Sequence, residues 1–158
     1  MATLQQQLQR VQKLTPTHLS NVLFQYLKSI EDEMAELNRN QIFKKSEDIF
    51  GQPLGTYSEA TEYITTNDAL LGKGTIIKKA GAPYDFKQTG VFLPSIFARV
   101  IDNQVLFGST DPKLDEIFDN VRLQSKSFFG LQDINKVFII QQRVLPFLNN
   151  HIRKELKL

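Results

Sequence analysis

The sequence has no cysteine and no tryptophan, and only two histidines among its 158 residues. The absence of cysteine excludes disulfide bonds, thiolate nucleophiles and every cysteine-ligated metal or iron–sulfur site. No run approaches the roughly 18 consecutive apolar residues that a transmembrane helix requires, so we expect no membrane partner. Packing of side chains must therefore stabilise the fold.

An excess of charge of either sign is missing as well. The 19 basic and 17 acidic residues give a net charge of +2, which by itself indicates neither a nucleic-acid nor a membrane-surface partner. The segment from residue 120 onward is locally basic, with seven lysines and arginines against two acidic residues. The first residues lack the basic segment and apolar run of a secretory signal, so we expect synthesis in the cytoplasm.

What is present is the composition of a globular protein, with 41% hydrophobic and 23% charged residues. A chain of this length can bury about two thirds of its unfolded surface. We expect one structural domain over residues 1–158. Its expected parts are a helical N-terminal part (1–46), a long loop region (47–90), a β-hairpin with a short helix (91–130) and a C-terminal helix (131–158).

The N-terminal part has apolar residues at spacings of three and four, which predicts a long amphipathic helix. Thr15 followed by Pro16 is a start signal, because the threonine hydroxyl accepts from a free backbone amide and proline is tolerated at the first helical position. The spacing of Leu4, Leu8 and Val11 predicts a separate short helix before it. The inward face expected for the long helix is Leu19, Val22, Leu23, Tyr26, Leu27, Ile30, Met34 and Leu37.

The C-terminal part predicts a second amphipathic helix from Asp133 onward. Pro146 should kink it or split it near Arg143, because proline removes one backbone hydrogen bond. The residues expected on its apolar face are Ile134, Val137, Phe138, Val144, Leu145, Leu148, Ile152 and Leu156.

Glycine and proline punctuate residues 47–90, which predicts a long loop. A loop of this length in a compact domain is more often functional or ordered by a partner than idle. Within it, Ser58 is placed to cap one short helical turn, and "GTIIKKA" (74–80) reads as a short strand.

After the loop, alternation over residues 96–101, a turn at Asp102 and Asn103, and a return over 105–107 predict a β-hairpin within a β signal that starts at Phe92. Thr110 or Asp111 should cap a short helix starting at Pro112. The predicted class is α+β: a long N-terminal helix and a kinked C-terminal helix packed against a small antiparallel sheet, with a long central loop.

No pattern indicates catalysis. His18 and His151 lie in opposite terminal helices, so a metal site with a carboxylate would need those helices to pack together, and neither histidine has a second one at helical spacing. The acidic run over residues 31–36 reads as a solvated helix face, and Lys73 between two glycines lacks the spacing of a phosphate-binding loop. The serines lack a nucleophile-elbow motif. We expect no enzyme, catalytic residue, cofactor or metal.

Basic residues suggest an alternative function. Lys73, Lys78, Lys79 and Lys87, with the basic C-terminal helix, are able to contact phosphates, and Phe128 and Phe129 to stack on bases. A nucleic-acid-binding accessory or assembly factor is therefore the alternative. An acidic protein partner accounts for the same charges.

Aromatic residues are the more informative feature. The chain has 12 phenylalanines, and seven of them fall between residues 86 and 129. A domain of this size cannot easily hide all of them, so we expect the surplus to be buried at a subunit interface.

Three segments carry a resemblance: "GQPLGTYSEAT" (51–61), "FKQTGVFLPSIFARVIDNQVLFGSTDPKL" (86–114) and "FFGLQDIN" (128–135). In order and spacing, over about residues 45–140, they resemble the tailed-phage virion-morphogenesis family of tail-completion and head–tail joining (neck) proteins, which includes versions from phages of Bacteroidetes. That family has a Y-S-x-x-T-like segment, a D-T-G turn leading into a hairpin, and a P-F-F/L-G-L motif before the last helix. Here glutamine stands in place of the aspartate, and Ser127 in place of the proline.

The resemblance implies a structural virion protein without enzymatic activity, found in the virion and assembled in the cytoplasm of the bacterial host. It implies a homo-oligomeric ring around the DNA passage, contacts with other neck, portal-adjacent or tail proteins, and a passing contact with genomic DNA. The positions it assigns to interactions are Tyr57, Ser58, Gln88, Thr89, Gly90, Phe92, Ser95, Phe128, Phe129, Gly130 and Leu131.

Overall fold

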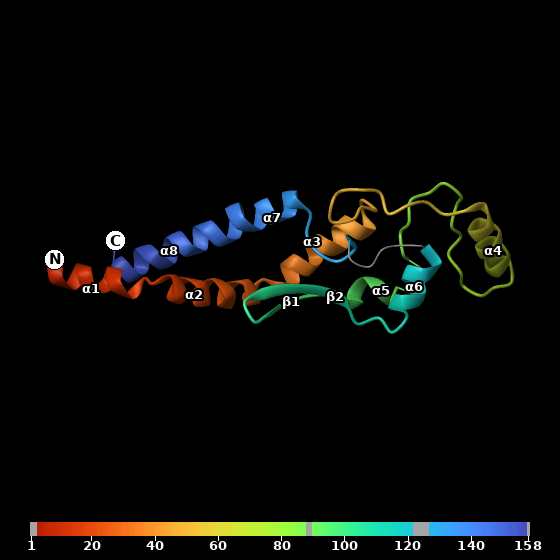
Figure 1. Ribbon diagram of the computed structural model, residues 1–158. Helices are drawn as coiled ribbons and strands as arrows, with labels where there is room; N and C mark the ends of the chain where they lie inside the picture. Colours follow the sequence, from red (N-terminus) through yellow and green to blue (C-terminus); the bar gives the residue numbers. More distant parts are fainter. Residues whose placement is uncertain (1–2, 88–89, 122–126, 158) are drawn as a thin grey trace.

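A computed structural model describes residues 3–87, 90–121 and 127–157 of the chain. The molecule is elongated (Figure 1), with the two termini at one end and helix α4 at the other. We call the end built from α1, α2 and α8 the stalk, and the end built from residues 51–87 the tip. The class is α+β, as predicted.

The N-terminal part is three helices. Leu4 and its neighbours form the predicted short helix, and the Thr15 hydroxyl caps the next one by accepting from the His18 amide at 3.2 Å. The predicted long helix is divided at Ile30, whose backbone leaves the helical conformation (φ −117°, ψ 20°). Three acidic residues then form the first turn of a new helix, where their negative charges interact favourably with its free backbone amides. The bounds are α1 (Leu4–Lys13), α2 (Pro16–Ser29) and α3 (Glu31–Phe43).

The predicted hairpin is confirmed as strands β1 (Ile96–Ile101) and β2 (Gln104–Ser109), which pair antiparallel. Asp102 and Asn103 have φ of 49° and 58°, the left-handed turn conformation that suits the twist of a two-residue hairpin. Ile96 and Ala98 are buried, and β1 packs against α3. The β signal expected from Phe92 is wrong at its start, because α5 (Phe92–Ser95) is one helical turn.

The predicted short helix after the hairpin is also confirmed, as α6 (Leu114–Val121). Asp111 rather than Thr110 makes its first bond, with the carboxylate accepting from the Lys113 amide at 2.9 Å. The helix starts two residues later than expected.

The prediction of a long loop is wrong over α4 (Glu59–Leu70), which is a helix of 12 residues rather than one turn. Ser58 does cap it, since its hydroxyl accepts from the Thr61 amide at 3.2 Å. The strand expected over residues 74–80 does not form. There the Lys78 amide bonds to the Thr65 hydroxyl at 3.0 Å instead of to a neighbouring strand.

The C-terminal helix consists of α7 (Asp133–Ile139), a π-helical turn η2 (Ile140–Val144) and α8 (Leu145–Leu156). The wider turn lies just before Pro146, where it lets the helix continue past a residue without an amide hydrogen. It also changes which residues face inward: Ile139 and Val144 are buried. The predicted apolar face is therefore wrong in part, because Ile134, Val137, Phe138 and Leu145 are exposed.

Two hydrophobic cores lie along the molecule. The first joins α2, α3, the hairpin and the C-terminal helix around Met34, Ala35 and Ala98. The second is aromatic and centres on Phe92, Phe118 and Phe128. None of the seven phenylalanines between residues 86 and 129 is exposed. The expectation that the surplus covers a subunit interface is wrong for Phe86, Phe92, Phe118, Phe128 and Phe129, because these five rings pack on one another inside the chain.

Candidate docking surfaces

The segment 128–132 is held from inside the molecule. Two buried amides on α3 reach it: the Asn38 side chain donates to the Gly130 carbonyl at 2.7 Å, and the Gln41 side chain donates to the same oxygen at 3.3 Å. Gln41 also accepts from the Gln132 amide at 2.9 Å. The segment thus fixes where the C-terminal helix begins.

The motif residues of this segment are core residues. Phe128 is fully buried, Leu131 is buried and Phe129 is half-buried. Gly130 has a backbone φ of +139°, a conformation that residues with a side chain rarely adopt. Phe92, from the turn motif, is buried as well. Phe92, Phe128 and Leu131 therefore present no side chain to a neighbouring subunit, and their expected docking role is corrected to a packing role.

Ser95 and Gly90 belong to the turn motif that precedes the hairpin. The Ser95 hydroxyl lies 2.6 Å from the Ser109 hydroxyl and donates to the Phe92 carbonyl, so it closes the base of the hairpin. Gly90 is exposed, with a φ of +72°. Gln88 and Thr89 lie outside the described residues.

Tyr57 anchors the tip through a network around a buried lysine. The Lys78 side chain is only 4% exposed, and its Nζ lies 2.6 Å from the Asp85 carboxylate and donates to the Lys87 carbonyl at 3.2 Å. The Tyr57 hydroxyl donates to the same carboxylate at 2.9 Å. A buried cation with a paired carboxylate keeps the loop in one conformation, because breaking the pair would leave a charge without a partner.

The ionisation of this network follows from its burial. Burial raises the pKa of Tyr57 to about 12, and the Asp85 carboxylate adds to the rise. Burial would also raise the pKa of Asp85, but hydrogen bonds from Lys78, the Lys87 amide and Tyr57 outweigh it and hold that pKa below its ordinary value. Asp85 is therefore ionised and Tyr57 protonated at neutral pH.

The tip carries an exposed apolar surface on α4. Tyr63 and Leu70, seven residues apart, are 70% and 80% exposed, and Ile64 and Leu71 are 57% and 72% exposed. Spacing by seven places each pair on one side of the helix, two turns apart. We call these four residues the tip surface.

A second exposed apolar stripe lies on α1 at the other end. Leu4, Leu8 and Val11 occupy one face of this helix and are 89%, 57% and 55% exposed. We call these three residues the stalk stripe. A third group, Ile134, Val137, Phe138 and Leu145, lies on the exposed side of the C-terminal helix.

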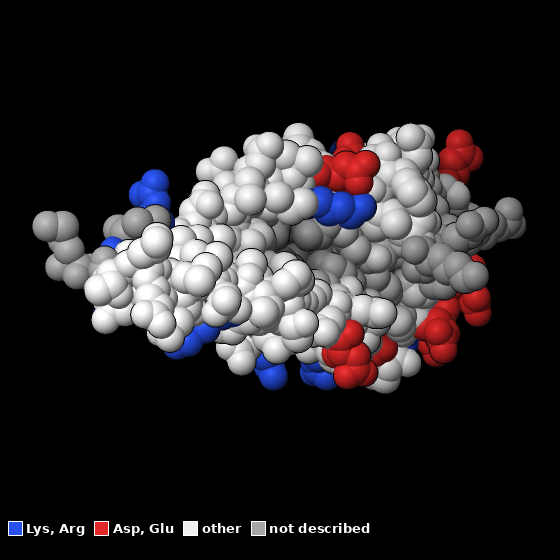
Figure 2. All heavy atoms as spheres, turned by 60° about the vertical axis from the view of Figure 1, so that its left-hand side comes forward, with Lys and Arg blue, Asp and Glu red and all other residues white. Residues whose placement is uncertain are grey.

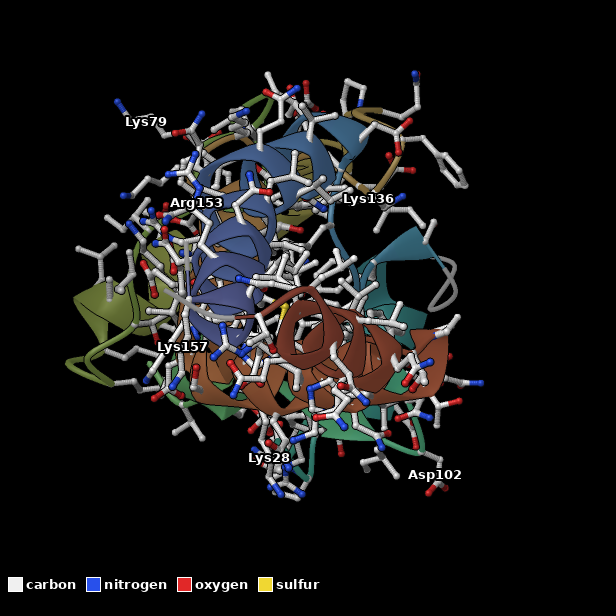
Figure 3. The ribbon with its side chains drawn as sticks, turned by 90° about the vertical axis from the view of Figure 1, so that its left-hand side faces the viewer. Lys28, Lys79, Asp102, Lys136, Arg153 and Lys157 are labelled. Carbon is white, nitrogen blue, oxygen red and sulfur yellow. The ribbon has the colours of Figure 1, made fainter. Side chains whose placement is uncertain are left out.

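Charge is distributed unevenly along the molecule. The stalk helices α1, α2 and α8 carry five basic residues and one acidic residue, Glu155, and Lys157 follows directly after α8. Figure 2, with the stalk end turned toward the viewer, shows a broad uncharged face with basic side chains along its lower edge. Figure 3 looks along the molecule from this end and shows Lys28 below the stalk helices and Arg153 and Lys157 to their left, so basic side chains lie on two sides of the stalk.

The two histidines meet in the stalk. Nε2 of His18 on α2 lies 3.4 Å from Nε2 of His151 on α8, beside a stacked pair of Tyr26 and Phe147 with ring centroids 4.0 Å apart. Among the described residues, no group of three or more potential metal-ligating side chains comes together. The histidine pair thus joins two helices of the stalk.

An open groove of about 470 Å³ runs between α2 and the hairpin turn, lined among others by Phe24, Lys28 and Asp102.

None of the helices in the described ranges has the length and apolar character needed to cross a bilayer.

Comparison with known proteins gave no match: no family model, no curated protein and no solved structure is significantly similar to the chain. The sequence motifs and the exposed surfaces are thus the observations on which a function can rest. The tip surface was missed from the sequence, although the apolar pairs 63–64 and 70–71 repeat at the helical spacing of seven.

Proposed function

We propose that this chain is a structural protein of a tailed-phage virion, which forms a homo-oligomeric ring in the neck or tail-completion region by subunit docking. Its further partners are the neck, portal-adjacent or tail proteins above and below the ring. The order and spacing of the three sequence motifs support this assignment.

The observation that carries the proposal is the tip surface. Four large apolar side chains stand exposed on one helix at the end of an elongated subunit. Contiguous exposed apolar groups on a small protein mark interaction sites more often than they occur idly. Contacts at the ends of an elongated subunit suit a ring, because each copy then meets a neighbour on either side.

Native mass spectrometry of the purified chain tests the proposal. A ring predicts one closed oligomer with a single copy number, in exchange with free subunits. A chain that remains monomeric at every soluble concentration would contradict self-association. Mixing in equal parts of an isotope-labelled chain gives the control, since a true oligomer then shows every mixed composition.

The basic stalk favours a second candidate, contact with DNA. Five basic residues against one acidic residue on three neighbouring helices, with Lys157 directly after the last of them, form a cationic surface. Binding through phosphates predicts an affinity for duplex DNA that falls steeply with salt, measurable by fluorescence anisotropy. Replacing Lys28 and Arg153 by glutamine should weaken it, whereas Lys79→Gln at the tip should not.

A further inference from the structure

The stalk helix α1 has its apolar side toward solvent. Its half-buried residues are Gln7 and Arg10, and the Arg10 guanidinium donates to the Leu156 carbonyl of α8 at 3.3 Å. The stalk stripe of Leu4, Leu8 and Val11 lies on another side of the helix and is exposed. This arrangement reverses that of an ordinary surface helix, which turns its apolar side to the core.

The tip helix α4 is reversed in the same way. Thr65, its one buried residue, accepts from the Lys78 amide, and the Glu62 carboxylate accepts from the Ala80 amide at 2.8 Å. Hydrogen bonds to the following loop, rather than apolar packing, therefore fix the inner side of this helix. The tip surface, with Tyr63 and Leu70 among its residues, points outward.

The two reversed helices match in length and lie at opposite ends (Figure 1). With 10 and 12 residues, α1 and α4 are about 15 and 18 Å long. The two helices are opposite in charge. Helix α1 has two basic residues and no acidic one, whereas α4 has three acidic residues and no basic one.

We propose that the stalk stripe of one copy packs on the tip surface of the next copy, in a head-to-tail contact. This inference rests on the proposed self-association and names its two surfaces. Pairing of like ends would bring two basic stalks together, whereas head-to-tail pairing brings opposite charges together. Such a contact joins unlike surfaces and closes into a ring when the rotation between copies allows it.

Disulfide trapping tests the contact, because the chain has no cysteine of its own. Gln12→Cys places a thiol one turn beyond Leu8. Asn67→Cys places one between the two pairs of residues that form the tip surface. Both positions lie at or beside an apolar stripe without belonging to it. Within one copy they are at opposite ends, so any bond between them joins two copies.

Mixing the two single-cysteine proteins under mild oxidation should give mainly mixed dimers, at least tenfold above either homodimer. A protein with Gln104→Cys on the hairpin, mixed with Gln12→Cys, is the matched control and should give no such excess. Homodimers in equal or greater yield, or no mixed dimer, would overturn the proposed contact.

The size of the unmodified protein separates this inference from the proposed function. A closed oligomer without mixed disulfides overturns the contact and leaves self-association standing. Mixed disulfides in a protein that is absent from phage particles support the contact and overturn the virion assignment. Leu8→Asp should in addition weaken oligomerisation at least tenfold while leaving the circular dichroism of the subunit unchanged.

Discussion

The side chain of Asn38 donates a hydrogen bond of 2.7 Å to the backbone carbonyl of Gly130, 92 residues further along the chain. Asn38 is fully buried on α3, and Gly130 lies just before the C-terminal helix. This bond therefore sets the position of the last helix against the N-terminal ones. The motif around Gly130 that resembles a phage family is, in this chain, part of that internal connection.

Asn38→Ala should lower the free energy of unfolding by about 1–3 kcal/mol, because it removes the closer of two donors from the part-buried Gly130 carbonyl. Urea unfolding followed by circular dichroism measures the change. Asn40→Ala, on the same helix but bonded to the exposed Glu36 carboxylate, is the control and should change stability by less than about 0.5 kcal/mol. Equal losses in both variants would argue against a special role for the Gly130 bond.

Phe128→Ala should destabilise the folded chain by about 3–5 kcal/mol, since its ring is fully buried in the aromatic core. Chemical unfolding again gives the value. Phe50→Ala removes a ring that is 74% exposed and should have little effect. If Phe128→Ala kept full stability and only abolished assembly, the packing role would be wrong and a docking role restored.

The buried Lys78–Asp85 pair predicts that the stability of the folded chain falls at acid pH. Because the pKa of Asp85 is lowered, its contribution to stability is present above the ordinary value of 3.8 and is lost as the pH falls through the lowered value. The Lys87 amide, which donates to Asp85 at 3.1 Å, reports this titration by NMR. Its midpoint should lie below 3.8 in the natural protein and rise in Lys78→Met; an unchanged midpoint would contradict the pairing.

Tyr57 predicts a dependence on alkali. Its pKa is raised from 10.0 to about 12. Its contribution to the free energy of unfolding is therefore complete below pH 10 and is lost as the pH rises toward 12. The ultraviolet absorbance of the phenolate should show one tyrosine titrating near pH 12. Tyr57→Phe should remove that component, and a titration curve unaltered by the substitution would assign it to another tyrosine.

Ile64→Asp combined with Leu71→Asp should abolish the proposed oligomer and change the stability of the folded chain by no more than about 0.5 kcal/mol, because both side chains are exposed in the single chain. Sedimentation velocity measures the oligomer. Ile134→Asp combined with Val137→Asp is the matched control, since it changes equally apolar exposed residues on the C-terminal helix. Loss of the oligomer in the control alone would move the docking surface to that helix.

The elements that could be predicted from the sequence are those with a local cause. The hairpin turn follows from two residues that tolerate the left-handed conformation, and the starts of α2 and α4 follow from hydroxyls that accept from nearby amides. These interactions span only a few residues. A single sequence therefore contains all that is needed to predict them.

The remaining features depend on distant parts of the chain. The β-branched pair Ile76 and Ile77 favours a strand, but the buried Lys78 pairs with Asp85, and this contact fixes the loop in another conformation. The direction in which a phenylalanine or a helical apolar face points is likewise set by packing partners. For this reason the aromatic surplus was predicted at an interface, and the reversed helix α4 was predicted as a loop.

The proposed virion role is tested most directly by quantitative mass spectrometry of purified particles of the tailed phage that this role implies, scaled to the portal protein. A structural ring of the neck or tail-completion region predicts a fixed copy number comparable to that of the portal protein. Absence of the chain from the particles would contradict a structural role in the virion.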